Sequence, residues 1–110
     1  VVSTIMSNIG LTKALDKLEI TNITADVGDR NVLEQMKKSG AVMGGEDSGH
    51  MIFLDCHTTG DGMLSALRLV DIMLKTGKSL SCLGSVMTIY PQVLMNVKVP
   101  ETKPDFMKIE

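Results

Sequence analysis

The sequence predicts an α/β domain with three layers, in which helices cover both faces of a small mixed four-stranded sheet. Strand-like apolar runs alternate with segments whose apolar residues recur every three or four positions, which is typical of strand–helix–strand units with parallel crossovers. The third and fourth runs are separated by too few residues for a crossover helix, so this edge strand is expected to be antiparallel to the other three. The 110 residues, 44% of them hydrophobic, suffice for one domain with its own core.

The chain opens with a predicted strand and helix. Residues 1–5 are apolar and β-branched, which favours a strand. Ser7 or Asn8 can cap the helix that follows, because their side-chain oxygens accept hydrogen bonds from free backbone amides. This helix has one apolar stripe with the i, i+3, i+4, i+7 spacing, made of Leu11, Ala14, Leu15 and Leu18.

A second strand and helix come next. Residues 20–27 contain alternating apolar positions and predict a strand that ends at Gly28. Asn31 followed by Glu34 resembles a capping box, which predicts a helix beginning near Asn31. Gly40 is expected to end this helix, since glycine readily adopts the left-handed conformation found after helix ends.

The third and fourth strands are predicted over residues 41–43 and 51–54, which are short apolar runs. Residues 44–50 between them, with the sequence GGEDSGH, are predicted to form a glycine-rich loop. A simple hairpin turn needs only a glycine, Asn or Asp at its bend, so the polar side chains of this loop call for another explanation.

The last part of the chain begins with a long apolar helix predicted over residues 62–76. Its polar positions lie on one narrow stripe formed by Ser65, Arg68, Asp71 and Lys75. Most of the helix is therefore expected to be buried, which requires a neighbour beyond one small sheet. Residues 80–87 predict a short helix, residues 92–99 an extended strand, and residues 100–110 a charged, proline-containing linker.

Composition excludes several classes of protein. The formal net charge is −2 and the lysines are scattered, so neither a nucleic-acid partner nor a basic binding face is expected. No apolar run approaches the ~20 residues that span a bilayer, so no membrane partner is expected. Cys56 and Cys82 match neither a disulfide framework nor paired metal-ligand spacing, and we expect reduced thiols in a cytoplasmic protein. The chain begins with neither Met nor the charged start of a signal peptide, and we interpret it as a piece of a longer protein.

The loop over residues 44–50 is the strongest candidate for a binding site. A carboxylate beside a hydroxyl can hold two neighbouring sugar hydroxyls, with Glu46 accepting hydrogen bonds and Ser48 accepting or donating them. A hydrogen bond to a charged group contributes ~1.5–3 kcal/mol net, enough to orient a sugar. From composition alone, an ordinary polar loop remains an equal alternative.

Two further clusters are weaker candidates. Arg30 could reach a phosphate or a sugar hydroxyl, although a helix-capping Asp29 and a surface arginine are the more common explanation of such a segment. A zinc site is also conceivable from four nearby side chains: His50, Asp55, Cys56 and His57. We reject the zinc site because adjacent cysteine and histidine side chains point to opposite sides of an extended chain and lack the usual ligand spacing.

Five segments occur in an order and spacing that resemble a known family. They are VSTIMSN at 2–8, VGDR at 27–30, GEDSGH at 45–50, TTGDG at 58–62 and YPQ at 90–92. As a set they resemble the phosphoglucosamine mutase branch of the α-D-phosphohexomutase superfamily, over roughly residues 1–99. The resemblance implies the third, sugar-binding domain of a four-domain isomerase, with a four-stranded mixed sheet, and residues 100–110 as the linker toward the fourth domain.

The resemblance also implies a reaction for the complete enzyme. Members of this branch interconvert glucosamine 6-phosphate and glucosamine 1-phosphate on the route to UDP-N-acetylglucosamine and peptidoglycan. A phosphoserine of the first domain donates its phosphoryl group, and a bisphosphorylated sugar is the intermediate. Mg²⁺ binds an Asp-rich loop of the second domain, and a phosphate-binding loop lies in the fourth. Because the sequence contains none of these three elements, the chain alone is expected to be inactive and to bind no metal or cofactor.

The site residues that the resemblance implies lie in two of the segments. Glu46 and Ser48 are expected to hold sugar hydroxyls in both substrate orientations. His50 is expected to provide a hydrogen bond or to handle a proton, and no other catalytic residue is expected in this chain. Asp29 and Arg30 belong to the segment that helps to distinguish sugars. The partners expected are thus a phosphosugar and the other domains of the same chain, with the oligomeric state left open.

The sequence departs from the family pattern at two positions. Asp47 stands where Gln or Asn is typical, and Asn31 stands where Tyr is typical. Two alternative functions remain: a domain of a phosphoglucomutase or phosphomannomutase, and a non-catalytic ligand-binding module with the same fold.

Overall fold

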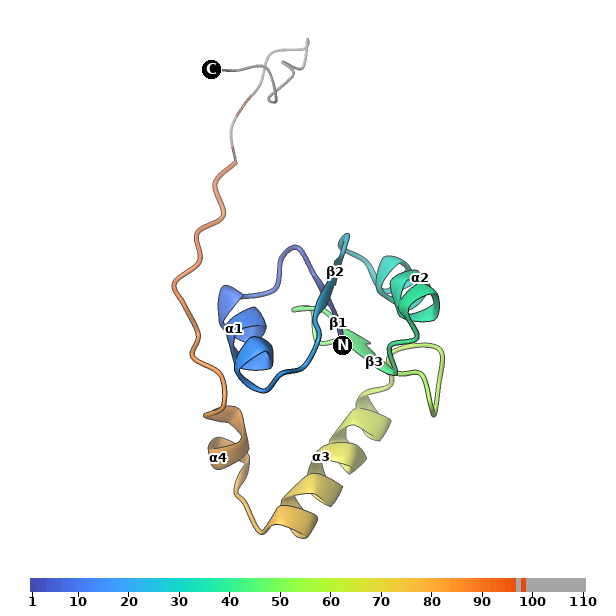
Figure 1. Cartoon of the computed structure of the whole chain (residues 1–110), viewed down its shortest axis with the longest axis vertical. Coiled ribbons are helices and arrows are strands. Elements are labelled where there is room, and N and C mark those ends of the chain that lie inside the picture. The colour runs from blue at the N-terminus through green and yellow to red at the C-terminus, as the bar shows by residue number, and fades with distance from the viewer. Residues whose placement is uncertain (97, 99–110) are drawn as a thin grey trace.

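The structure, a computed structural model, describes residues 1–96 and residue 98. Its elements, in chain order, are β1 (Val2–Thr4), α1 (Ile9–Lys17), β2 (Ile23–Ala25), α2 (Asp29–Ser39), β3 (Met43–Gly45), β4 (Met51–Phe53), α3 (Gly62–Thr76) and α4 (Leu80–Gly84). The strands and the first two helices lie together, and α3 and α4 extend from them in a V (Figure 1).

The four strands form one mixed sheet in the order β2–β1–β3–β4. β1 runs parallel to β2 and to β3, whereas β4 is antiparallel to β3. The predicted sheet of three parallel strands and one antiparallel edge strand is confirmed. Because β1, β2 and β3 are parallel, their carboxyl ends meet at one edge of the sheet, together with the amino end of β4.

Helices lie on both faces of the sheet, as predicted (Figure 1). α2 covers one face, and the core between them consists of Val2, Ala25, Val32, Met36 and Ile52. Side chains alternate along a strand, so Ser3 and Met43 point to the opposite face. There they line a cavity of about 190 Å³ together with Leu11 of α1.

Gly44 explains why the third strand is shifted from its predicted position over residues 41–43. A Cβ at Gly44 would lie 2.6 Å from the sulfur of Met36 and 2.8 Å from Cγ1 of Val32. The glycine is therefore what allows α2 to approach β3 closely. Our assignment of Gly44 and Gly45 to the loop was wrong, because glycine is disfavoured in strands in general and only this packing contact requires it.

α2 begins two residues before the predicted capping box. Its N-cap is Gly28, with φ of 119°, and Asp29 is its first residue. Asn31 lies inside the first turn, where its side-chain Nδ2 donates to the carbonyl of Val27 at 2.8 Å. The positive φ turns the chain at Gly28, and an acidic residue in the first turn suits the positive end of the helix dipole. Gly40 ends the helix in the left-handed conformation, as predicted.

α3 has the predicted bounds, and within this chain it is exposed. Asp61 caps it by accepting from two backbone amides, and Gly77 ends it with φ of 66°. No residue of this helix is buried, and Leu67 and Leu74 are 64% and 79% exposed. The predicted burial requires a neighbour beyond the small sheet, and the described residues supply none, so it stays a prediction. Within the described chain, α3 faces β3 and β4 across a cavity of about 530 Å³ whose lining includes Met51, Phe53, Leu69 and Ile72.

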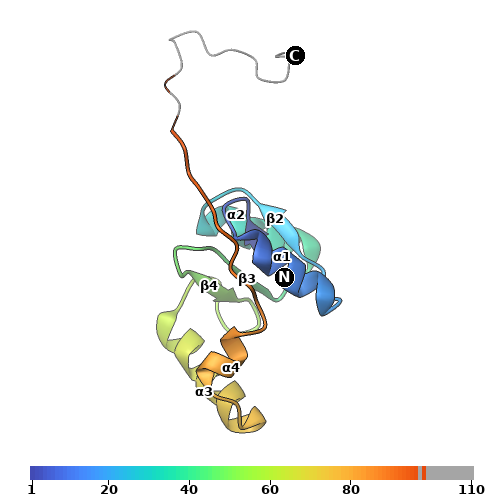
Figure 2. The same ribbon diagram turned by 90° about the vertical axis from the view of Figure 1, so that its left-hand side faces the viewer.

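The segment after α3 departs further from prediction. α4 ends at Gly84 rather than at residue 87. Residues 92–96 and 98 form no strand and run away from the sheet, so the strand predicted over residues 92–99 is wrong in its described part (Figures 1 and 2). A strand needs a neighbouring strand that pairs with its backbone, and no backbone hydrogen bond joins these residues to any other among those described. Residues 97 and 99 and the linker predicted over residues 100–110 lie outside the described residues. Within the described part of the chain, no helix has the length and apolarity to cross a membrane.

Candidate functional site

The loop between β3 and β4 consists of residues 46–50 and lies at the sheet edge where the parallel strands end. The backbone amide of Glu46 donates to the carbonyl of His50 at 3.1 Å, and the amide of Gly49 donates to the carbonyl of Glu46 at 3.0 Å. Gly49 has φ of 93°, which side chains disfavour. These constraints form a tight turn, which projects the polar side chains of the loop from a fixed backbone.

The carboxylate of Glu46 is held by the amino end of α2. Its Oε2 accepts from the backbone amide of Gly28 at 3.1 Å, and its Oε1 lies 3.6 Å from Nδ1 of His50. The side chain is 11% exposed. A carboxylate at a helix amino terminus is favourable because the helix dipole and the unpaired amides there are electropositive. Glu46 is therefore fixed in position before any ligand arrives.

His50 connects the rest of the loop to this carboxylate. Its Nδ1 lies 3.0 Å from Oγ of Ser48, and the ring remains 57% exposed. A Cβ at Gly60 would lie 3.1 Å from Cδ2 of the ring, so the TTGDG segment passes directly behind it. Since Nδ1 faces Ser48 and Glu46, Nε2 is the ring nitrogen that can meet a ligand.

Asp29 and Arg30 lie in the first turn of α2, and both are exposed. Oδ1 of Asp29 accepts from the backbone amide of Arg30 at 2.7 Å. The contact between their segment and the loop is made by the backbone of Gly28, not by these two side chains. The structure thus brings the VGDR, GEDSGH and TTGDG segments together.

Sequence reasoning identified Glu46, Ser48 and His50 but missed the two glycines that position them. Gly28 supplies a backbone donor to Glu46, and Gly60 allows the following loop to approach His50. The only signal in the sequence was the presence of glycine inside both neighbouring segments. Periodicity and side-chain chemistry do not reveal a contact made by the backbone.

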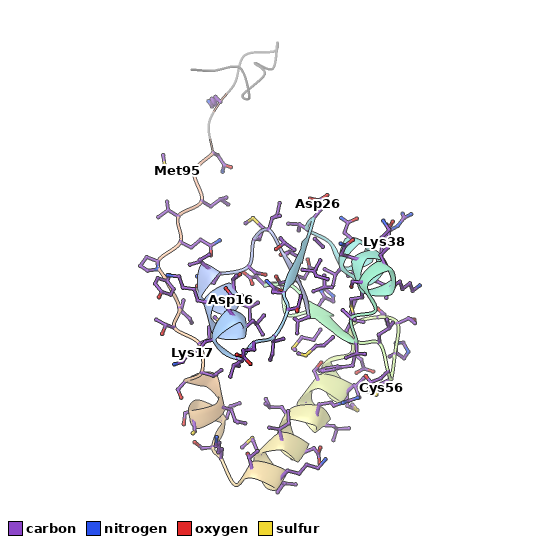
Figure 3. All side chains as sticks on the ribbon, in the orientation of Figure 1. Asp16, Lys17, Asp26, Lys38, Cys56 and Met95 are labelled. Carbon is purple, nitrogen blue, oxygen red and sulfur yellow. The ribbon has the colours of Figure 1, made fainter. Side chains whose placement is uncertain are left out.

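A second polar cluster lies on the loop after β4 and beside the first turns of α3, where Figure 3 labels Cys56. Nη2 of Arg68 donates to Oδ2 of Asp55 at 2.6 Å and lies 2.8 Å from the sulfur of Cys56. The hydrogen bond from Arg68 holds the pKa of Asp55 below its usual value. Arg68 also lies over the ring of Phe53, at 5.1 Å from its centre. This cluster ties α3 to the end of the sheet.

A resident metal ion does not fit the described part of the chain. Among residues 1–96 and 98, no three His, Cys, Asp or Glu side chains gather into a group that could hold one. Cys56, a member of the rejected zinc cluster, instead contacts a guanidinium, which carries the wrong charge for a metal neighbour.

Comparisons with known proteins agree with this geometry. The family model described as phosphoglucomutase/phosphomannomutase, alpha/beta/alpha domain III, matches residues 1–90, a range that contains all three converging segments. A phosphoglucosamine mutase of Desulforapulum autotrophicum is 64% identical over 110 residues, which are 100% of this chain and 24% of that protein.

Other relatives with the same name show similar coverage. A phosphoglucosamine mutase of Clostridium novyi is 55% identical over 105 residues, which are 96% of this chain and 23% of that protein. One of Bacillus pumilus is 58% identical over 101 residues, 92% of this chain and 22% of that protein. The chain spans about a quarter of the length of these relatives. It belongs to the phosphoglucomutase/phosphomannomutase family, as the α/β/α domain III of that family.

Proposed function

We propose that this chain is the sugar-binding domain of a phosphoglucosamine mutase, an enzyme that interconverts glucosamine 6-phosphate and glucosamine 1-phosphate. The observation that carries the proposal is the fixed carboxylate of Glu46, held at 3.1 Å by the amide of Gly28 within the loop that joins β3 and β4. The names of the relatives support the choice of substrate.

Glu46 and Ser48 bind the sugar hydroxyls. A carboxylate has about four acceptor positions, and the hydrogen bond from the Gly28 amide uses one of them. The remaining positions accept two neighbouring hydroxyls of the sugar ring, at ~1.5–3 kcal/mol for each charge-assisted bond. Because these hydroxyls lie between the two phosphorylated ends, the same contacts serve both orientations of the substrate.

His50 donates a hydrogen bond to the substrate or handles the proton of the hydroxyl that receives the phosphoryl group. Its Nδ1 is directed at Ser48 and Glu46, which orients the ring and leaves Nε2 to accept or donate the proton. Asp29 and Arg30, exposed at the adjacent helix terminus, contact the distinguishing substituents of the sugar.

The phosphoryl group itself comes from outside this chain. In the proposed reaction, a phosphoserine elsewhere in the longer protein transfers its phosphoryl group to the sugar, and the bisphosphorylated sugar returns the other one. Mg²⁺, when bound in the complete enzyme, neutralises phosphate charge, and its ligands also lie elsewhere. We further propose that the complete enzyme is cytoplasmic, where its phosphosugar substrate is made and consumed.

The test compares Glu46→Gln with Asp47→Asn in the full-length protein that contains this domain. Glu46→Gln replaces charge-assisted hydrogen bonds with neutral ones, and we expect kcat/KM with glucosamine 6-phosphate to fall by ~10- to 100-fold. Asp47 is the adjacent acidic residue and is exposed, so its amide variant should remain within a few-fold of the parent. Equal losses in the two variants, or a Glu46→Gln variant with normal kinetics, would contradict the assignment.

Parallel assays with glucosamine 6-phosphate, glucose 6-phosphate and mannose 6-phosphate separate the proposal from its alternatives. The highest kcat/KM is expected with the amino sugar. A preference for glucose or mannose phosphate would instead assign the domain to a phosphoglucomutase or phosphomannomutase. Absence of turnover with all three sugars would favour a non-catalytic binding module.

A further inference from the structure

Residues 88–92, here called the strap, lie along the amino-terminal half of α1 (Figures 1 and 2). The side-chain amide of Asn8 forms two hydrogen bonds with the backbone of Tyr90, one as donor and one as acceptor. Nδ2 of Asn8 donates to the Tyr90 carbonyl at 2.8 Å, and the Tyr90 amide donates to Oδ1 of Asn8 at 3.0 Å. This paired contact joins segments that are 82 positions apart in the sequence.

Asn8 makes this contact while it caps α1. Its Oδ1 also accepts from the amide of Gly10 at 3.0 Å, and its Nδ2 lies 3.4 Å from Oε1 of Gln92. Two hydrogen atoms and two lone pairs are the full capacity of an asparagine amide, and all four are used. Asparagine is therefore the side chain that can cap the helix and bind the strap at the same time. Asp, Ser and Thr can cap the helix but lack the two amide hydrogens that the strap accepts.

Three further contacts fix the strap. Nε2 of Gln92 donates to the carbonyl of Met6 at 3.1 Å, and Nζ of Lys13 lies 4.3 Å above the ring of Tyr90. A Cβ at Gly10 would lie 1.9 Å from the carbonyl oxygen of Thr88. Gly10 is thus required for the strap to lie this close to the helix, independently of the hydrogen bonds.

We propose that Asn8 latches the strap onto α1 and thereby fixes the place at which the chain leaves the domain. Asn8 lies on the segment that directly follows β1. The carboxyl end of β1 and the loop over residues 46–50 lie at the same edge of the sheet. Residues after the strap, such as Met95, lie away from the sheet (Figure 3). The latch therefore fixes the position of the strap relative to the loop over residues 46–50. The inference does not depend on which sugar is bound.

Two variants open the latch, one by removing hydrogen bonds of Asn8 and one by adding a methyl group that crowds the Thr88 carbonyl and lies 3.0 Å from Oδ1 of Asn8. Asn8→Asp retains a good helix cap but loses both donor hydrogens and places a charged oxygen against the Tyr90 carbonyl. Gly10→Ala improves helix propensity by up to ~1 kcal/mol but puts a methyl group where the Thr88 carbonyl lies. Asp16→Asn, at an exposed position of the same helix, serves as the control.

The measurement is hydrogen exchange followed by mass spectrometry. It is made on the full-length protein that contains this domain. We expect peptides over residues 86–92 to exchange at least tenfold faster in both latch variants, while peptides over α1 and the control variant stay within twofold of the parent. In the 110-residue chain, which has one tyrosine and no tryptophan, Tyr90 fluorescence should become more accessible to acrylamide in the same two variants.

The proposal fails if either latch variant leaves exchange over the strap within twofold of the parent. It also fails if α1 loses protection as much as the strap does, because the effect would then come from unfolding of the helix. Activity is not needed for this measurement, so its outcome is separate from that of the sugar assays.

Discussion

Gly44 determines how closely α2 packs against the sheet. Any side chain there meets Met36 and Val32, which are both almost fully buried. We expect Gly44→Ala to lower the free energy of unfolding by ~1–3 kcal/mol, because added volume in a packed core forces neighbours out of position. Urea denaturation followed by circular dichroism measures this change.

Gly62→Ala is the matched control for that substitution. A Cβ at Gly62, the first residue of α3, meets nothing within 4 Å. This variant should be neutral or slightly stabilising, since alanine favours helices. If both alanine variants destabilise the chain equally, close packing at Gly44 is not the cause.

At the level of single residues, side-chain chemistry suggested candidates for the site, whereas the backbone contacts that position them could not be predicted. Glu46, Ser48 and His50 stood out because a turn of that length does not need them. The amide of Gly28 that fixes Glu46 could not be predicted, because a glycine before a helix has many roles. Asn8 was predicted as a possible cap, but its bonds to Tyr90 depend on tertiary contact between distant segments.

At the level of elements, boundaries were predicted well where local signals alone set them. α3 begins and ends as predicted because Asp61 can cap it and Gly77 can end it without help from the rest of the molecule. The start of α2 and the position of β3 were wrong because packing decided them: Gly28 contacts Glu46, and Gly44 lies under Met36. The burial of α3 stays a prediction, because periodicity shows which face is apolar and not what covers it, and no covering neighbour lies among the described residues.

The tether between Arg68 and Asp55 should make the stability of α3 docking depend on pH. In the folded chain the pKa of Asp55 lies below its usual 3.8, chiefly because of the hydrogen bond from Arg68. A lowered folded-state pKa stabilises the fold above the unfolded value, and this contribution is lost as the pH falls through the folded value. At about pH 6 the parent should therefore melt roughly 1–3 °C above Asp55→Asn, and the difference should vanish near about pH 2.

A matched variant for this experiment is Asp71→Asn. It removes an ion pair with Lys75 inside α3 and leaves the tether to the loop intact. Hydrogen exchange over residues 54–57 should increase in Asp55→Asn and not in Asp71→Asn at about pH 6. A tether without energetic effect would give the same exchange in all three proteins.

At the level of the whole molecule, the order of elements predicted the mixed sheet and its two covered faces. Parallel crossovers have one favoured hand, and a short link requires an antiparallel neighbour, so few topologies were compatible with the sequence. The path after α4 was not predictable in the same way. Residues 92–96 alternate as a strand does, but they pair with neither edge of the sheet. Asn8 and Met6 instead bind the residues at the start of this segment, beside α1.

The division of labour within the longer protein leads to a prediction for the 110-residue chain alone. It presents the side chains proposed to bind the sugar, but phosphoryl transfer also needs a phosphoryl donor and neutralisation of the phosphate charge. The sequence lacks the donor serine segment, and the described residues contain no group of side chains that could hold a metal. We therefore expect the purified, folded chain to give no interconversion of glucosamine phosphates, with or without added Mg²⁺. The measurement is a coupled assay of glucosamine 1-phosphate formation, in which the Glu46→Gln chain, prepared identically, identifies contamination by a host enzyme. Equal residual rates in the two preparations come from the host. A rate that is present in the parent chain and lost in Glu46→Gln would show that this domain catalyses the reaction by itself.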